Sequence, residues 1–393
     1  MFYLGIDVGK HAHHACLIDE TGKVIVKPFK FTVNSTGYRR LLSSIKEMDK
    51  DDISIGFEAT GPYWLTLFQY LKSDKLQNIS VFNPLQVSSF RNQSIRGIKT
   101  DKVDCLLIAN ILRMGDYVNY RLPPDELLSL RELCRFRADL VSQLARLKVR
   151  ILSVLDLVFP EYGKLFSNVF GISSKAVLSL ACTPEEIANL DLSKLKKLIQ
   201  KRSHSHIKAD KAHQLRQAAK SSVGIRFCLD AFSMELNFML EHLKFLEAQI
   251  KDLERKIKSI FKEQDTKLTS IPGIADVNAA AILSEIGDIV NFTKQGAKKL
   301  VAFAGLDAKV KDSGQHKGKP KMSKRGSRYL RHAIFQSSLV ASLHDPLFKS
   351  IYQKQVRRGK SHRVAISHVA NKMTHVIYSV LKNNKPYFCP IEG

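Results

Sequence analysis

Short apolar runs separated by turns dominate the first hundred residues and predict β-strands. Five strands are predicted, at Tyr3–Ile6, His13–Ile18, Lys23–Thr32, Ile53–Phe57 and Ile79–Phe82. Apolar residues at helical spacing follow the capping residue Asn34, fill Trp64–Leu71 and resume at Asn83-Pro84. The order β-β-β-α-β-α-β-α predicts a mixed sheet with helices packed on it.

From Asp125 onward the apolar spacing lengthens into threes and fours, which predicts long helices. The cleanest run has eight seam positions: Leu236, Met239, Leu243, Leu246, Ile250, Leu253, Ile257 and Ile260. A seam of this length predicts coiled-coil arms, and the pattern leaves open whether the arms pair within one chain or between chains. Between the arms, 161–222 is predicted to be a helical insert, whose lysines are either a solvated face or a nucleic-acid contact.

The last third of the chain is predicted to be mainly helical. A turn at Ile271–Ile274 precedes a predicted alanine-rich helix, Val277–Ile286. The free amides at the start of this helix could bind a phosphate, as in helix-hairpin-helix elements. The other interpretation is an ordinary connection between helices. Helical segments after Ser327 supply further core. The fold class is therefore α/β plus all-α, with domains at 1–120, 121–265 and 266–393.

Charge separates the C-terminal part from the rest. The chain of 393 residues has a formal net charge of +25, and from Val290 onward 21 lysines and arginines face only four acids. Such an excess indicates a polyanionic partner, either nucleic acid or an anionic surface. No apolar run is long enough to span a bilayer and the six cysteines lack metal-ligand spacing, so a cytoplasmic protein without zinc or disulfides is expected.

Four acidic residues form the candidate chemistry. Asp7 and Glu58 each end an apolar strand, and Asp101 and Asp104 share one face at the start of a helix capped by Thr100. Taken alone, a turn aspartate or two solvated acids in a first helical turn are ordinary. Together, the four carboxylates match the hard oxygen ligands of a two-Mg²⁺ site that stabilises an in-line phosphoryl displacement.

Basic residues near two segments are the candidate nucleic-acid contacts. The first segment is a predicted mobile loop, Phe90–Lys99, and the second, 309–331, mixes cations with glycines and serines. The candidates are Lys10, Arg91, Arg96, Lys99, Lys309, Lys311, Lys317, Lys319, Lys321, Lys324, Arg325, Arg328 and Arg331. Within the second segment, Ser313 is by local pattern an ordinary turn serine, because no adjacent base activates it.

Motifs spread over the chain carry a resemblance to a known family. GIDVGK, FEATGPY and KTDKVD occur in the first third, and IPGI, FAGL, DSG and MSKRGSRYLR near the end. In this order and at these separations the chain resembles a DEDD transposase of the insertion-sequence family numbered one hundred and ten, related to Piv-type DNA invertases. The insert at 161–222 makes it a longer member.

The resemblance implies a fold and an active site. It implies an N-terminal RuvC-like (RNase H-fold) domain in which Asp7, Glu58, Asp101 and Asp104 bind Mg²⁺. It also implies a C-terminal serine that joins covalently to DNA, which maps to Ser313 of the D-S-G motif, with Ser323 of M-S-K as the weaker candidate. The resemblance further implies action as a dimer or tetramer and a noncoding bridge RNA that pairs with target and donor DNA.

The resulting prediction is a transposase or recombinase that cuts and rejoins double-stranded DNA with a Mg²⁺-binding acidic tetrad and a serine nucleophile, guided by RNA. Three alternatives stay open. They are a Piv-type site-specific invertase, a RuvC-like junction nuclease that uses water, and a non-catalytic nucleic-acid-binding protein.

Overall fold

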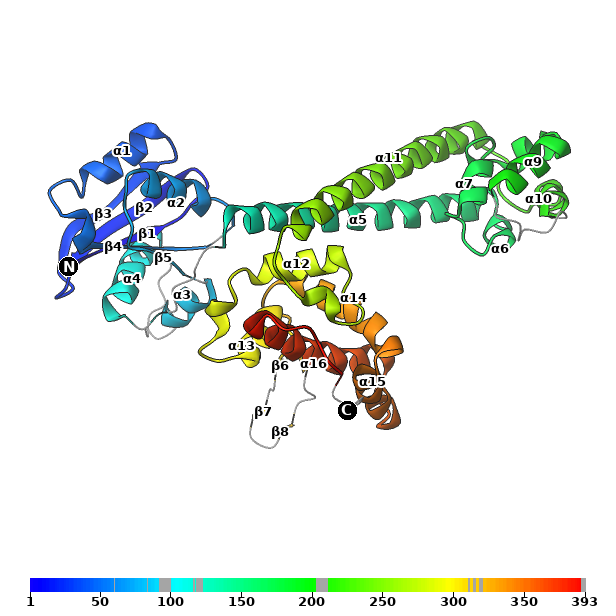
Figure 1. Cartoon of the computed structure of the whole chain (residues 1–393). Helices are drawn as coiled ribbons and strands as arrows, with labels where there is room; N and C mark the ends of the chain where they lie inside the picture. Colours follow the sequence, from blue (N-terminus) through cyan, green and yellow to red (C-terminus); the bar gives the residue numbers. More distant parts are fainter. Residues whose placement is uncertain are drawn as a thin grey trace. The chain divides into compact units, whose positions relative to one another are not determined.

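The computed structural model describes most of the chain (Figure 1). The described residues are 1–59, 61–82, 84–91, 100–115, 117, 123–202, 211–309, 312–313, 316–317 and 321–389. They form two compact units, one of Met1–Pro123 with Asp288–Gln295 and one of Pro124–Gly287 with Gly296–Gly393. The predicted mobile loop at Phe90–Lys99 lies, from residue 92 onward, outside the described residues.

A mixed five-stranded sheet forms the centre of the first unit, as predicted. Its strands are β1 (Phe2–Asp7), β2 (Ala12–Asp19), β3 (Val24–Thr32), β4 (Ile53–Glu58) and β5 (Ile79–Phe82), in the order β3-β2-β1-β4-β5. The first three strands are antiparallel neighbours, whereas β4 pairs parallel with both β1 and β5. This topology is consistent with an RNase H-like domain.

Helices cover both faces of the sheet. The helices α1 (Ser35–Ser43) and α2 (Trp64–Ser73) share one apolar core with the inward residues of β1, β2 and β4. On the opposite face lies α4 (Asp101–Met114), with α3 (Pro84–Arg91) beside it. The approach of α4 to β1 is so close that a Cβ on Gly5 would lie 2.1 Å from the Cys105 carbonyl oxygen, which explains the glycine.

Two helices of 34 residues each, α5 (Asp125–Val158) and α11 (Leu229–Lys262), pack against each other in the second unit. The ion pairs Arg137–Glu254 at 2.6 Å and Arg150–Glu235 at 2.8 Å show that the helices run antiparallel. The arms therefore pair within one chain, which resolves the alternative that the sequence left open. A supercoil and pairing between copies stay predictions.

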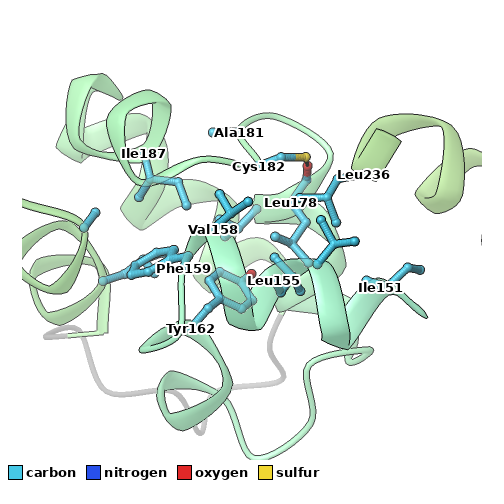
Figure 2. Packing of buried hydrophobic residues seen from close by; sticks show 14 of the residues in the cluster. Ile151, Leu155, Val158, Phe159, Tyr162, Leu178, Ala181, Cys182, Ile187 and Leu236 are labelled. Carbon is cyan, nitrogen blue, oxygen red and sulfur yellow. Dashed lines mark hydrogen bonds between the residues drawn. The ribbon is translucent and has the colours of Figure 1, made fainter. Parts of the chain in front are cut away.

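The insert between the arms is helical, and it shares one apolar core with residues of α5 and α11. Its helices are α6 (Tyr162–Leu165), α7 (Ile172–Leu178), α8 (Pro184–Asn189), α9 (Leu192–Arg202) and α10 (Lys211–Lys220). Figure 2 shows Tyr162 and Phe159 packed with Leu155 and Val158 from the last turns of α5. The buried Tyr162 hydroxyl donates to the Ser174 carbonyl oxygen at 3.0 Å, so the polar group has a partner.

The C-terminal part of the second unit is mainly helical. It contains α12 (Asp276–Ile286), α13 (Ala297–Ala304), α14 (Arg328–His344), α15 (Pro346–Arg357) and α16 (His362–Asn383). A buried carboxylate ties three segments together, because Glu285 accepts hydrogen bonds from Arg135 at 2.6 and 3.1 Å and from the Ser327 hydroxyl at 2.7 Å. None of the described helices combines the length and apolar character needed to cross a bilayer.

Two short ladders connect α13 to α14. Strand β6 (Ala308–Lys309) pairs with β9 (Lys321–Met322), and β7 (Asp312–Ser313) pairs with β8 (His316–Lys317). The described part of the basic segment predicted at 309–331 therefore contains these two short ladders and, from Arg328, the first turn of α14.

Candidate active site

The carboxyl ends of two parallel strands bring Asp7 and Glu58 to one edge of the sheet. Asp7 is the last residue of β1 and Glu58 the last of β4, and the register pairs Ile6 with Phe57 just before them. Continuous apolar residues bury each strand up to its carboxylate, where both side chains become half-buried. The local sequence thus delivers two acids to the same place.

The first turn of α4 supplies the other two acids. The Thr100 hydroxyl caps this helix by accepting from the Val103 amide at 3.3 Å, as predicted. Asp104 points inward, and its side chain is only 7% exposed, whereas that of Asp101 is 69% exposed. The helix N-terminus offsets part of the cost of holding these negative charges together.

Electrostatics indicate that the four carboxylates act on one another. The pKa of Asp7 is raised from 3.8 to about 6, first by burial and then by repulsion from Asp104, Asp101 and Glu58, in that order. Repulsion between neighbouring carboxylates favours the protonated form of one of them. A cation placed among them would remove this repulsion, so the site suits a positively charged ligand.

His14 is a site residue that the sequence analysis missed. It lies on β2 directly opposite Asp7, and its Nδ1 is 3.3 Å from an Asp101 carboxylate oxygen. One ligand atom each from Asp7, His14 and Asp101 lie within 4.8 Å of one another. The register in which β1 pairs with β2 would have identified His14. The alternation of apolar and polar residues does not define that register to the exact residue.

Arg91 contacts the buried acid of the site. Its guanidinium donates to the Asp104 carboxylate, with Nε and Nη2 each 3.0 Å from Oδ1. The same cation partly opposes the rise of the Asp7 pKa. Arg91 was predicted to contact nucleic acid, and in this structure it balances the charge of the Asp104 carboxylate.

The exit from β1 is ordered by a second histidine. The buried His13 ring accepts a hydrogen bond from the Gly9 amide at its Nδ1, at 3.2 Å. Burial, followed by the neighbouring His14, lowers the pKa of His13 to about 4, so its ring is neutral at pH 7. A neutral ring here fixes the chain that follows Asp7 without adding positive charge.

The two candidate serines lie in the second unit, in different surroundings. Ser313 is in β7 opposite His316, and only its backbone is described. The Ser323 hydroxyl donates a hydrogen bond to the Asp307 carboxylate and accepts one from the Arg325 amide at 3.3 Å. These hydrogen bonds connect the residues that follow β9 to Asp307, which precedes β6. The Ser323 hydroxyl therefore has a structural role.

The predicted basic contacts fall into three groups. The exposed cations are Lys10, Lys324, Arg325 and Arg328, while the half-buried Arg331 donates to the Ala304 carbonyl oxygen at 2.9 Å. Lys309, Lys317 and Lys321 are in the short strands, with only their backbone described. Arg96, Lys99, Lys311 and Lys319 lie outside the described residues.

The donor set at the sheet edge fits a divalent cation. Carboxylate oxygens are the ligands that Mg²⁺, Ca²⁺ and Mn²⁺ prefer, and an imidazole nitrogen extends the range toward softer metals. The pKa of Asp7 is raised first by burial and then by the neighbouring carboxylates, so both favour a cation beside it. Within the described residues, this edge therefore combines suitable ligands with an electrostatic need for a cation.

Comparison with known proteins identifies the same two regions. Residues 4–160 match the DEDD transposase profile of the IS110 family, and residues 265–353 match the transposase profile of the IS116/IS110/IS902 family. Together the two profiles cover more than half of the chain. The first profile spans the sheet with its four acids, and the second spans the hairpin with both serines.

Full-length relatives agree with the profiles, and their similar length shows that the prediction of a longer member was wrong. The chain is 24% identical to an uncharacterized 44.8 kDa protein of insertion element IS116 from Streptomyces clavuligerus and 25% identical to a mini-circle putative transposase for IS117 from Streptomyces coelicolor, each match covering 98% of this chain and 95% of the relative. It is 23% identical to a pilin gene-inverting protein from Moraxella lacunata, over 98% of this chain and 97% of that protein. The chain therefore belongs to the IS110 family and is an insertion-sequence transposase, an enzyme of DNA recombination.

Proposed function

We propose that this transposase cuts and rejoins DNA strands with a divalent-metal site of Asp7, Glu58, Asp101 and Asp104 and with Ser313 as the nucleophile. The proposal is supported by the charges of Asp104, Asp101 and Glu58, each of which raises the pKa of Asp7, after burial, and by the ligand atoms of Asp7 and Asp101, which lie with that of His14 within 4.8 Å of one another. The ions, Mg²⁺ by the hardness of the carboxylate oxygens, would supply Lewis-acid stabilisation of the reacting phosphate.

The chain's own residues have distinct roles in this proposal. Asp7 and Glu58, fixed on strands, hold the site rigidly, and Asp104 on α4 completes it from the buried side. The Ser313 oxygen forms a bond to the scissile phosphorus, while the bond from that phosphorus to the oxygen of the leaving strand breaks. That oxygen becomes the end of the leaving strand. The serine proton goes to solvent or to the departing oxygen, and reversal onto another strand rejoins the DNA. The phosphoserine linkage conserves the bond energy between these steps.

Partners follow from charge and from the exposed surface. The basic hairpin suits phosphate contacts that do not depend on base sequence, which agrees with guidance by a bridge RNA whose base pairing selects the sites. The α5–α11 hairpin carries exposed apolar side chains, Phe136, Val149, Phe238 and Phe245, each more than half exposed. An apolar surface of this kind supports assembly into dimers or tetramers.

Covalent trapping on element-end DNA tests the nucleophile. Wild-type protein is expected to form a DNA adduct that maps to Ser313, Ser313→Ala is expected to form none, and Ser323→Ala is expected to retain it if it folds. An adduct that persists in Ser313→Ala would overturn the assignment. Cleavage by Ser313→Ala at the wild-type rate would instead favour a nuclease that uses water.

Two further measurements test the partners and the reaction outcome. Sequencing of RNA that co-purifies with the protein is expected to give one discrete structured transcript, whereas random fragments would contradict guidance. Similarity to a pilin gene-inverting protein makes inversion the second candidate outcome of the same chemistry. A reporter flanked by element ends distinguishes excision and insertion from inversion by the product junctions.

A further inference from the structure

A large basic cleft lies in the second unit. It has a volume of about 1220 Å³, larger than the few hundred to 1,000 Å³ of ordinary small-molecule pockets. Six cations line it: Lys324, Arg328, Arg331, Lys360, Arg363 and Lys372. The last three belong to α16 or to its N-terminal approach and were not among the predicted nucleic-acid contacts.

The cleft walls are two helix faces. The α14 residues Arg328, Arg331 and Phe335 recur at helical spacing along one wall, and the α16 face from Arg363 to His375 forms another. The opposite faces of both helices carry buried core residues. Since the apolar faces are already packed, the polar faces are free to bind a ligand without unfolding the unit.

The cations of α16 are available for such a ligand. Within the described part of the chain, no ion pair involves Lys360, Arg363 or Lys372, and all three are exposed. The acidic lining residue is Asp307, whose carboxylate accepts the Ser323 hydroxyl. Positive charge in the cleft is therefore in excess.

Rings also line the cleft. They are Phe335 and the imidazoles of His332, His368 and His375. Burial, with help from the nearby Lys372 and Lys298, lowers the pKa of His375, which favours a neutral ring. Cations that follow a phosphate backbone beside rings on which bases stack are typical of sites for single-stranded nucleic acid.

The cleft adjoins the hairpin that carries Ser313. Ala308 of β6 and Met322 of β9 line the cleft and pair with each other at the base of that hairpin. A strand lying in the cleft would therefore pass the base of the segment in which Ser313 is located.

We propose that the α14–α16 cleft binds a single strand of DNA, through phosphate contacts to Lys360, Arg363 and Lys372 and base stacking on Phe335 and His368. This inference rests on the proposed function only in assigning the bound strand as the one to be joined to Ser313. The binding site itself is independent of metal and of the nucleophile.

The test is a binding titration of the full chain in EDTA with a fluorescent oligothymidylate of about 12 nucleotides, within the range of single-strand sites. The triple variant Lys360→Ala/Arg363→Ala/Lys372→Ala loses three phosphate contacts. At about 0.7 counterions per contact, the slope of log K against log salt falls by roughly 2, and affinity at 0.15 M salt falls roughly 50-fold. His368→Ala and Phe335→Leu, which remove ring faces, each weaken binding at least about fivefold.

A matched control removes three exposed cations elsewhere in the second unit, as Lys251→Ala/Lys256→Ala/Lys258→Ala on α11. This variant retains near wild-type affinity for the strand. Photocrosslinking of a 4-thiothymidine oligonucleotide to the α14 or α16 peptides provides a second readout, which stays positive even if the cleft variant folds poorly.

The proposal is overturned if the cleft triple and the α11 triple bind the strand equally, or if the crosslinks map outside α14 and α16. Stronger cleft-dependent binding of an oligouridylate or of a duplex of the same length would also overturn the commitment to single-stranded DNA. Asp7→Asn is expected to keep the crosslink. A wild-type protein that crosslinks but never forms an adduct would refute the proposed function and leave the cleft assignment standing.

Discussion

Replacement of Asp7 by asparagine is expected to stabilise the metal-free protein. The folded-state pKa of Asp7, about 6, lies above its reference value of 3.8, so the folded state binds this proton more tightly than the unfolded state. The wild-type protein accordingly loses stability as pH rises from 4 to beyond 6. The asparagine side chain of the variant is neutral at every pH and avoids that loss, so its advantage is complete at pH 7 and absent below about pH 4.

The size of the stabilisation by Asp7→Asn follows from the shift in the pKa of Asp7. A shift of about two pKa units corresponds to about 3 kcal/mol, and because Asp7 is only half-buried, solvent screening reduces the expected gain to about 1–2 kcal/mol. For a unit of this size, that gain raises the unfolding midpoint by roughly 3–10 °C.

Trp64 makes the measurement specific to the first unit. It is the chain's one tryptophan and lies buried on α2, so its fluorescence reports unfolding of this unit. In EDTA at pH 7.5 the Asp7→Asn midpoint should exceed that of wild type, and the difference should vanish near pH 4. Addition of Mg²⁺ should stabilise wild type more than the variant, because a ligand that binds the native state shifts the equilibrium toward it.

The control is Asp19, a half-buried acid of the same sheet. Its carboxylate accepts hydrogen bonds from Thr21 and Lys23, which lower its pKa, so Asp19→Asn should destabilise the unit at pH 7.5. A lower midpoint for Asp7→Asn in EDTA, like that of Asp19→Asn, would refute the argument that the carboxylates repel one another.

Three other substitutions test separate parts of the structure. Glu285→Ala leaves Arg135 without its buried partner and should destabilise the second unit by about 3–5 kcal/mol, as measured by circular dichroism, and an unchanged midpoint would contradict this role. His14→Ala should weaken Mn²⁺ binding roughly tenfold in calorimetric titration and Mg²⁺ binding less, and equal losses would argue against an imidazole ligand. Gly5→Ala should lower the Trp64 midpoint, since its Cβ would overlap the Cys105 carbonyl oxygen, and an unchanged midpoint would contradict the close approach of α4 to β1.

Most of the first unit was predictable from the sequence, because two of its apolar strands end directly at candidate site residues. Apolar runs terminated by Asp7 and Glu58 indicated both the strands and the acids, and Thr100 indicated the start of α4. Periodicity likewise predicted α5 and α11 as long helices. Their pairing with each other within one chain became clear only from the structure. A row of apolar residues along a helix does not specify which helix packs against it.

Contacts that depend on strand register or on helix packing were missed, although Arg91 itself was among the predicted nucleic-acid contacts. His14 faces Asp7 only because β1 and β2 pair in one particular register, and Arg91 reaches Asp104 only through the packing of α3 against α4. The cleft was missed for a different reason. The α16 residues Arg363, Ser367, Asn371 and His375 of its lining recur every four positions, which the sequence displays, but a polar helix face is usually solvated unless a second face is known to lie opposite it.

Arg91 and His14 suggest how the acidic site persists without metal. Burial and then repulsion from Asp104, Asp101 and Glu58 raise the pKa of Asp7, so its charged form is unfavourable without a metal. Arg91 offsets part of this repulsion at Asp104, and His14 lies within reach of Asp101. A metal ion competes for those same carboxylate oxygens, so metal binding should release Arg91, on the helix that precedes the predicted nucleic-acid-binding loop. Metal binding at the acidic site and phosphate binding by Arg91 would then be coupled. The Arg91 guanidinium cannot bind the Asp104 carboxylate and a DNA phosphate equally well at the same time.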